Sequence, residues 1–86
     1  MILLIERLIN LLATLLILLV FLAAILSFVL SPTHPVRNAV DRIVNPMLAP
    51  IRRVVPLVGS LDLSPLILII LIEIISYALI RLLSLL

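Results

Sequence analysis

Cysteine, lysine and tryptophan are absent from this sequence, and histidine and glycine occur once each. Without cysteine the chain has no disulfide and no thiolate metal site, and His34 alone cannot supply a two-histidine metal site. The single glycine excludes a glycine-rich phosphate loop, and no serine stands at a nucleophile elbow. These absences predict a chain that is not an enzyme and that has no catalytic residues, no metal ligands and no cofactor site.

Hydrophobic residues, by contrast, make up 66% of the 86 residues. The few polar residues that remain cannot cover the core of a soluble protein of this size. The chain therefore belongs in a bilayer. The uncharged run 8–30 has 23 residues and as a helix would reach about 34 Å, enough to cross roughly 30 Å of hydrocarbon. It is too long for a secretory signal peptide, and the charges of Glu6 and Arg7 before it cancel, which favours an uncleaved span.

A second apolar run, 65–86, begins with features typical of a helix start. Ser64 can accept a hydrogen bond from an orphan backbone N–H, Pro65 has no N–H to satisfy, and Asp62 suits the positive end of the helix. The sequence therefore predicts an all-α membrane protein with one unit, 1–86. The two transmembrane helices, 8–30 and 65–86, form an antiparallel hairpin and are joined by the connection 31–64.

The connection is longer than a hairpin needs, and its first half is patterned as an amphipathic helix. Apolar residues recur at helical spacing between Val36 and Val44, with Arg37, Asp41 and Arg42 on the other side. Arg37 and Asp41 are four residues apart and can form an ion pair. We expect an interfacial helix whose aliphatic face meets lipid or the two spans and whose arginines face water.

The second half of the connection, NPMLAPIRRVVP, repeats this amphipathic pattern, and Arg52 and Arg53 face away from its aliphatic residues. Proline is tolerated at the start of a helix, but it bends or breaks the helix interior. We therefore predict that this second short helix starts at Asn45 and Pro46 and ends at Pro56. We predict a corner in it at Pro50.

Orientation follows from the arginines that flank the spans. The ends opposite the connection carry one each, Arg7 and Arg81. The connection carries four, which are also our candidates for contact with a partner or with anionic lipid: Arg37, Arg42, Arg52 and Arg53. We expect a bacterial inner membrane protein with a cytoplasmic connection and both termini outside, and the small net charge of +2 gives no reason to expect direct nucleic-acid binding.

The second span carries a polar series at steps of four, Glu73, Tyr77 and Arg81. Glu73 lies roughly 12 Å into the predicted helix, near the bilayer midplane, where an ionised carboxylate costs several kcal/mol unless it is paired. It is therefore protonated or faces a partner. A rotor-ring subunit also has such an acid, but the first span here lacks the glycines that tight ring packing requires.

A similar series on the first helix consists of Glu6, Asn10 and Thr14. In an antiparallel hairpin Asn10 and Thr14 come to about the depth of Arg81 and Ser84. Hydrogen bonds across the pair would join the two spans. For Glu73, the alternative is contact with a neighbouring subunit or with a polar group of a cofactor.

The segments NPMLAPIRRVVP and DLSPLI resemble the YggT family of small bacterial and plastid membrane proteins. The resemblance covers essentially the whole chain. The residues that match the family pattern are Asn45, Pro46, Pro50, Ile51, Arg52, Arg53, Pro56, Asp62, Ser64 and Pro65.

The resemblance implies a non-enzymatic hairpin that scaffolds or assists other integral membrane proteins. Family members are associated with cell-division gene neighbourhoods, nucleoid distribution, osmotic tolerance and, in one plastid branch, haem assembly into a cytochrome b subunit. A thylakoid or plastid membrane is the alternative location. Two other functions stay open: an oligomeric ion or osmolyte conduit using Glu73, and an assembly factor for a haem-bearing cytochrome complex.

Overall fold

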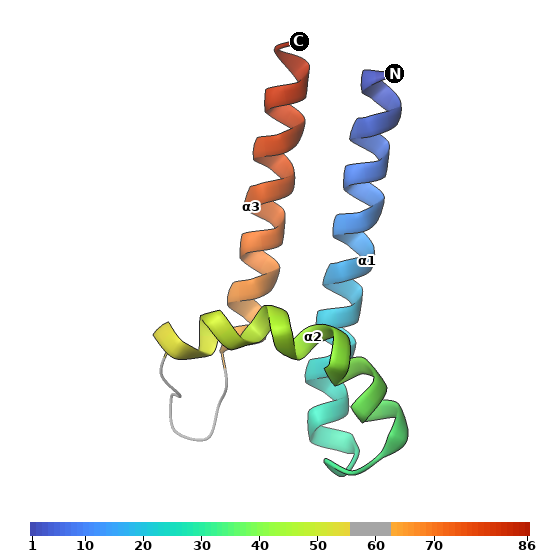
Figure 1. The fold of residues 1–86 in the computed structure, drawn as a ribbon, viewed down its shortest axis with the longest axis vertical. Coiled ribbons are helices and arrows are strands. Elements are labelled where there is room, and N and C mark those ends of the chain that lie inside the picture. Colours follow the sequence, from blue (N-terminus) through green and yellow to red (C-terminus); the bar gives the residue numbers. More distant parts are fainter. Residues whose placement is uncertain (56–62) are drawn as a thin grey trace.

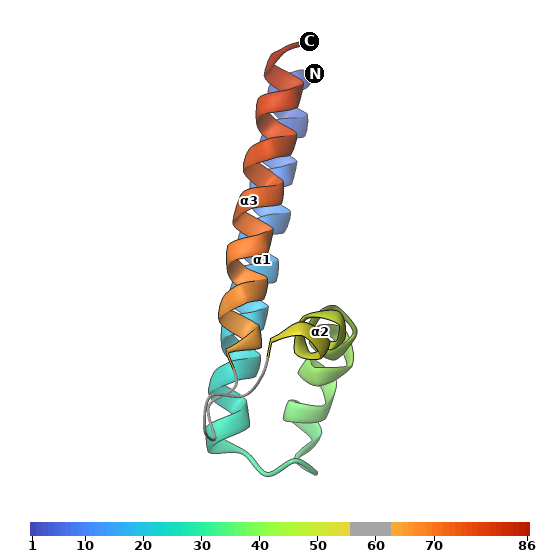
Figure 2. The same cartoon turned by 90° about the vertical axis from the view of Figure 1, so that its left-hand side faces the viewer.

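The computed structural model describes residues 1–55 and 63–86, which form three helices: α1 (Ile2–Val29), α2 (Pro35–Val54) and α3 (Ser64–Ser84). Figure 1 shows α1 and α3 side by side with both chain termini at one end, and α2 lying across the hairpin toward its other end. Figure 2 shows that α2 lies to one side of the layer formed by α1 and α3. The predicted all-α hairpin with a structured connection is confirmed.

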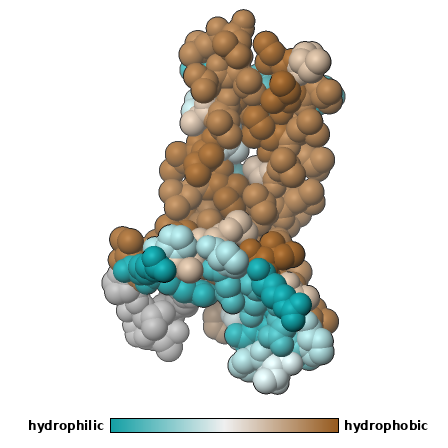
Figure 3. Space-filling view, in the orientation of Figure 1, coloured by the Kyte–Doolittle hydropathy of each residue, from teal (hydrophilic) through white to brown (hydrophobic). Residues whose placement is uncertain are grey.

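Both α1 and α3 are long and apolar enough to cross a membrane. α1 begins at Ile2 and ends at Val29, so it includes Glu6 and Arg7 as well as all but the last residue of the uncharged run. Most of the large aliphatic side chains on both helices point outward, and the spans form a continuous apolar surface (Figure 3). Such a surface suits lipid rather than water, because water disfavours contiguous apolar area of this extent.

The core lies at the end of the hairpin that α2 covers. It is formed by buried residues of all three helices: Val20 and Ala23 of α1, Val44 and Leu48 of α2, and Leu68 of α3. Part of the aliphatic face of α2 therefore packs against the spans. For that part, the predicted neighbour is the pair of spans and not lipid. Other members of the predicted apolar stripe stay outside, since Val36 and Ile43 are 53% and 55% exposed.

The connection forms one helix where the sequence predicted two. Pro46 and Pro50 both lie inside α2, and each removes a backbone hydrogen bond and crowds the preceding turn, which bends a helix without necessarily ending it. The ribbon turns where green gives way to yellow-green in the middle of α2, ahead of Pro50 (Figures 1 and 2). The bend thus lies ahead of the corner predicted at Pro50, and Asn45 lies inside α2 and does not cap a new helix.

The start of α3 is shifted by one residue from the prediction. Ser64 is already the first helical residue, Leu63 takes the capping position and Pro65 lies in the first turn. A difference of one residue is within the usual scatter of helix boundaries. Two residues with predicted roles at helix ends lie outside the residues that the structure describes. They are Pro56, the predicted end of the connecting helix, and Asp62, predicted to suit the start of the second span.

Candidate functional site

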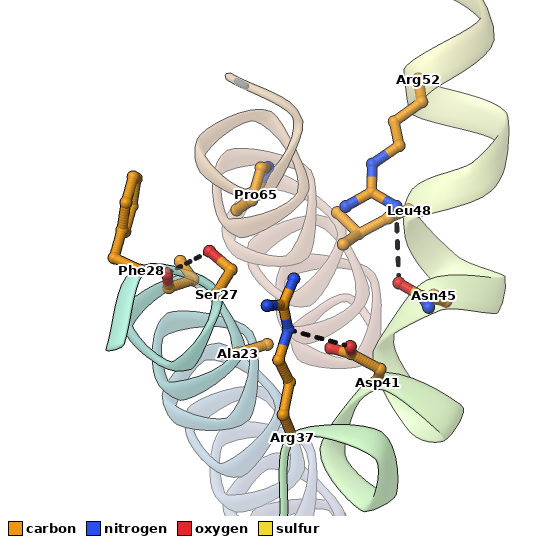
Figure 4. Close-up of a pocket in the computed structure, with 10 residues that line it drawn as sticks. Ala23, Ser27, Phe28, Arg37, Asp41, Asn45, Leu48, Arg52 and Pro65 are labelled. Atoms are coloured by element: carbon orange, nitrogen blue, oxygen red, sulfur yellow. Dashed lines mark hydrogen bonds and ion pairs between the residues drawn. The ribbon is translucent and has the colours of Figure 1, made fainter. Parts of the chain in front are cut away.

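A pocket of about 430 Å³ lies where the three helices meet (Figure 4). We call it the junction pocket. The end of α1 and the first turn of α3 form its apolar side, and α2 supplies most of its polar groups. Its lining residues are Ala23, Ala24, Ser27, Phe28, Arg37, Asp41, Asn45, Leu48, Arg52 and Pro65.

Arg37 enters the junction pocket from the first turn of α2 (Figure 4). Its Nη1 donates a hydrogen bond to the carbonyl oxygen of Leu30 at 2.9 Å, and its Nε lies 3.6 Å from Oδ2 of Asp41. The predicted ion pair with Asp41 is thus confirmed. The prediction that Arg37 faces water is wrong: its side chain is only 19% exposed, because the first turns of α2 run back along the end of α1.

Arg52 approaches the same pocket from the other end of α2 (Figure 4). Its Nη1 donates to Oδ1 of Asn45 at 3.4 Å. Asn45, predicted as a helix cap, therefore orients an arginine instead. Two guanidinium groups from opposite ends of one helix converge on a single pocket.

The junction pocket is suited to bind an anion. Two arginines and one aspartate, Asp41, give its charged side chains a net charge of +1. The planar guanidinium group matches the oxygens of phosphate and carboxylate groups.

Ser27 is no nucleophile here, since its hydroxyl donates to the carbonyl oxygen of Ala24 at 2.6 Å. The described residues also contain no cluster of metal-ligating side chains.

The sequence contains a signal for this pocket. Arg37, Asp41, Asn45, Leu48 and Arg52 follow one another at steps of four, four, three and four, which is the spacing of one helix face. The signal is lost when the connection is divided into two helices at Asn45, as in the prediction. Asp41 and Asn45 were consequently missed as members of one site with the arginines.

The other two candidate arginines do not line the junction pocket. Arg42 is exposed and lines a shallow surface depression with Asn38 and Pro46. Arg53 is exposed at the end of α2. Of the four cations that the sequence grouped together, Arg37 and Arg52 therefore line the junction pocket and the other two do not.

A second candidate region is the polar stripe of α3, which we define as Glu73, Tyr77 and Arg81. All three side chains are exposed, Tyr77 to 64%. The guanidinium carbon of Arg81 lies 5.8 Å from the centre of the Tyr77 ring, a cation–π geometry. The stripe does not face α1, because the α3 side of the groove between the spans is formed by other residues: Ile72, Ile75, Ser76 and Leu79.

The hydroxyl groups that we expected to join the spans bond within their own helices. Thr14 donates to the carbonyl oxygen of Asn10 at 2.8 Å, and Ser84 donates to that of Arg81 at 2.7 Å. Hydroxyls commonly return to a carbonyl three or four residues earlier in this way. Apolar packing, with the small residue Ala13 buried in α1, brings the spans together instead.

The family model described as CCB3/YggT matches residues 2–83. The chain belongs to the CCB3/YggT family. The resemblance seen in the motifs is thereby confirmed over nearly the whole chain. No match was found among curated proteins or among solved structures.

In this YggT protein, several residues of the family pattern meet at the helix junction. Asn45 and Arg52 form the contact described above, and Pro65 lines the junction pocket. Ser64 is fully buried beside it in the chain. The motif is thus built around the contact between the amphipathic helix and the start of the second span.

Proposed function

We propose that this YggT protein is a non-enzymatic accessory subunit that docks against transmembrane helices of other membrane proteins. Family membership and the two apolar helices support a membrane accessory protein. The observation that carries the finer proposal is the outward polar stripe of α3. In a hairpin without a partner, we would expect these polar side chains to face the other span.

Glu73 is the strongest part of this argument. It lies nine residues beyond Ser64, roughly 13 Å along the helix and close to the middle of a bilayer of about 30 Å. Its side chain is exposed on the hairpin, and ionisable groups inside a membrane normally face a protein partner or a water-filled cavity. A neighbouring helix with a hydrogen-bond donor or a basic side chain at that depth is the matching partner.

Arg42 and Arg53, exposed on α2, supply the second part of the docking surface. Positive charge beside the membrane favours the cytoplasmic side, so the partner meets α2 there. Acidic residues next to the partner's spans would complement these arginines. The bacterial inner membrane remains our assignment for the location.

The proposal is tested by placing the photocrosslinking residue p-benzoylphenylalanine at position 77 of the full chain in native membranes. The matched control places it at position 78, because Ala78 is also exposed but lies a helix step to the side. We expect position 77 to yield a discrete product with a different protein, and position 78 to yield little. Adding Glu73→Leu should lower the yield at position 77, since the partner's polar group loses its match.

The same experiment separates docking from the conduit alternative, in which copies of the chain assemble around Glu73. A conduit predicts products at whole multiples of the chain's own mass. Such products would contradict docking on another protein. Equal yields at positions 77 and 78 would contradict the stripe as the docking surface.

A further inference from the structure

We propose that the junction pocket binds the phosphate group of one anionic phospholipid. This site is separate from the polar stripe of α3 and does not depend on partner docking. It also differs from general attraction between a basic surface and a membrane, because it uses two particular arginines.

The first argument is the arrangement of donors around the pocket. A guanidinium group has five N–H donors. Leu30 and Asp41 engage Nη1 and Nε of Arg37, and Figure 4 shows its head directed into the pocket between α1 and α3. Arg52 reaches in from the opposite side. A phosphate between them would meet arginine donors from two directions.

The second argument is that Arg37 is held in place before any ligand arrives. Its anchors are a carbonyl at the end of α1 and a carboxylate one turn along α2. A side chain fixed in this way loses little conformational freedom when it binds. Arg37 is thus a positioned anion ligand and not a mobile surface charge.

The third argument identifies a lipid as the source of the phosphate. The junction pocket has an apolar side that includes Ala23, Ala24 and Phe28, all from the end of the apolar span α1. The polar surface of α2 borders the apolar surface of the spans (Figure 3). Lipid phosphates occupy this boundary between headgroups and acyl chains. A volume of about 430 Å³ also falls within the usual range for small-molecule sites, about 300–1,000 Å³.

The test is a titration of the full chain, purified in a nonionic detergent, with phosphatidylglycerol, followed by native mass spectrometry. The affinity of the first bound lipid is compared between Arg52→Gln and its neighbour control Arg53→Gln. Both variants remove one positive charge from adjacent positions. We expect Arg52→Gln to weaken the first binding step about tenfold, as for a lost charged hydrogen bond, and Arg53→Gln to change it less than about twofold.

Two further variants separate binding from folding. If circular dichroism shows that Arg52→Gln does not fold, Arg52→Lys replaces it, and we expect a smaller loss because the charge stays while the planar donors are removed. Asp41→Asn keeps a side-chain oxygen that can accept from Nε of Arg37, and it raises the pocket charge from +1 to +2. It should therefore tighten phosphatidylglycerol binding, and the absence of tightening would contradict an anion site.

The proposal is overturned if Arg52→Gln and Arg53→Gln lose affinity equally, or if neither loses it. Phosphatidylcholine, which has no net charge, should bind more weakly than phosphatidylglycerol, and equal binding would overturn the anionic preference. Inorganic phosphate provides the last arm. If millimolar phosphate displaces the lipid fully, the pocket belongs to a soluble anion and the lipid assignment is wrong.

Discussion

At the scale of single residues, neighbouring arginines of α2 have different surroundings. Arg37 and Arg42 lie on one helix within two turns, yet Arg37 contacts α1 through Leu30 while Arg42 is exposed. The net value of a hydrogen bond to a charged group is about 1.5–3 kcal/mol, whereas exposed charges contribute little to stability. The position on the helix face, and not the residue type, therefore decides what each arginine does.

This difference predicts the effect of removing each charge. Arg37→Gln should lower the free energy of unfolding by about 1–2 kcal/mol, because the Leu30 carbonyl and Asp41 lose their partner. Arg42→Gln should change it by less than about 0.5 kcal/mol. Unfolding of the full chain in mixed micelles with increasing sodium dodecyl sulfate, followed by circular dichroism, measures both. Equal losses would show that Arg37 is not an anchor between α1 and α2.

At the scale of the elements, the amphipathic pattern predicted the existence of α2 and its aliphatic face. It did not predict how much of that face is buried. Val44 is fully buried among the spans, while Ile43, its neighbour in the same predicted stripe, is exposed. The rotation of the bent helix on the hairpin decides between them, and rotation depends on packing between segments far apart in the sequence.

The two residues provide a matched pair for testing how α2 is held. Val44→Ala should cost about 1–3 kcal/mol of packing, since a fully buried side chain is cut back. Ile43→Ala should cost less. Hydrogen–deuterium exchange is the measurement, and we expect faster exchange across α2 in Val44→Ala while the spans stay protected. Faster exchange of α2 in both variants alike would contradict the observed rotation of the helix.

At the scale of the whole molecule, the two spans place both chain termini at the same end, with α2 toward the opposite end (Figure 1). The charge count adds a direction, because four arginines lie in the connection and only Arg7 and Arg81 lie toward the termini. The hairpin and the charge bias together predict that both termini are outside the cytoplasm.

Reporter fusions test this orientation. An alkaline phosphatase fused before Met1 or after Leu86 should be active at both ends in a bacterial inner membrane, and a green fluorescent protein at either end should not fluoresce. Fluorescence at both ends would reverse the orientation but keep the hairpin. Different results at the two ends would contradict the hairpin itself.

The sequence alone determined that this chain is a membrane hairpin with an amphipathic connection, since the length, hydrophobicity and periodicity of a segment are local properties. It also determined the Arg37–Asp41 pair, which needs only one turn of helix. Only the tertiary structure decided that Arg37 and Arg52 share a pocket and that the polar stripe of α3 faces away from α1. The physical reason is that a helix can rotate about its own axis without changing its sequence pattern. Side-chain packing at the junction, together with the bend in α2, selects one rotation.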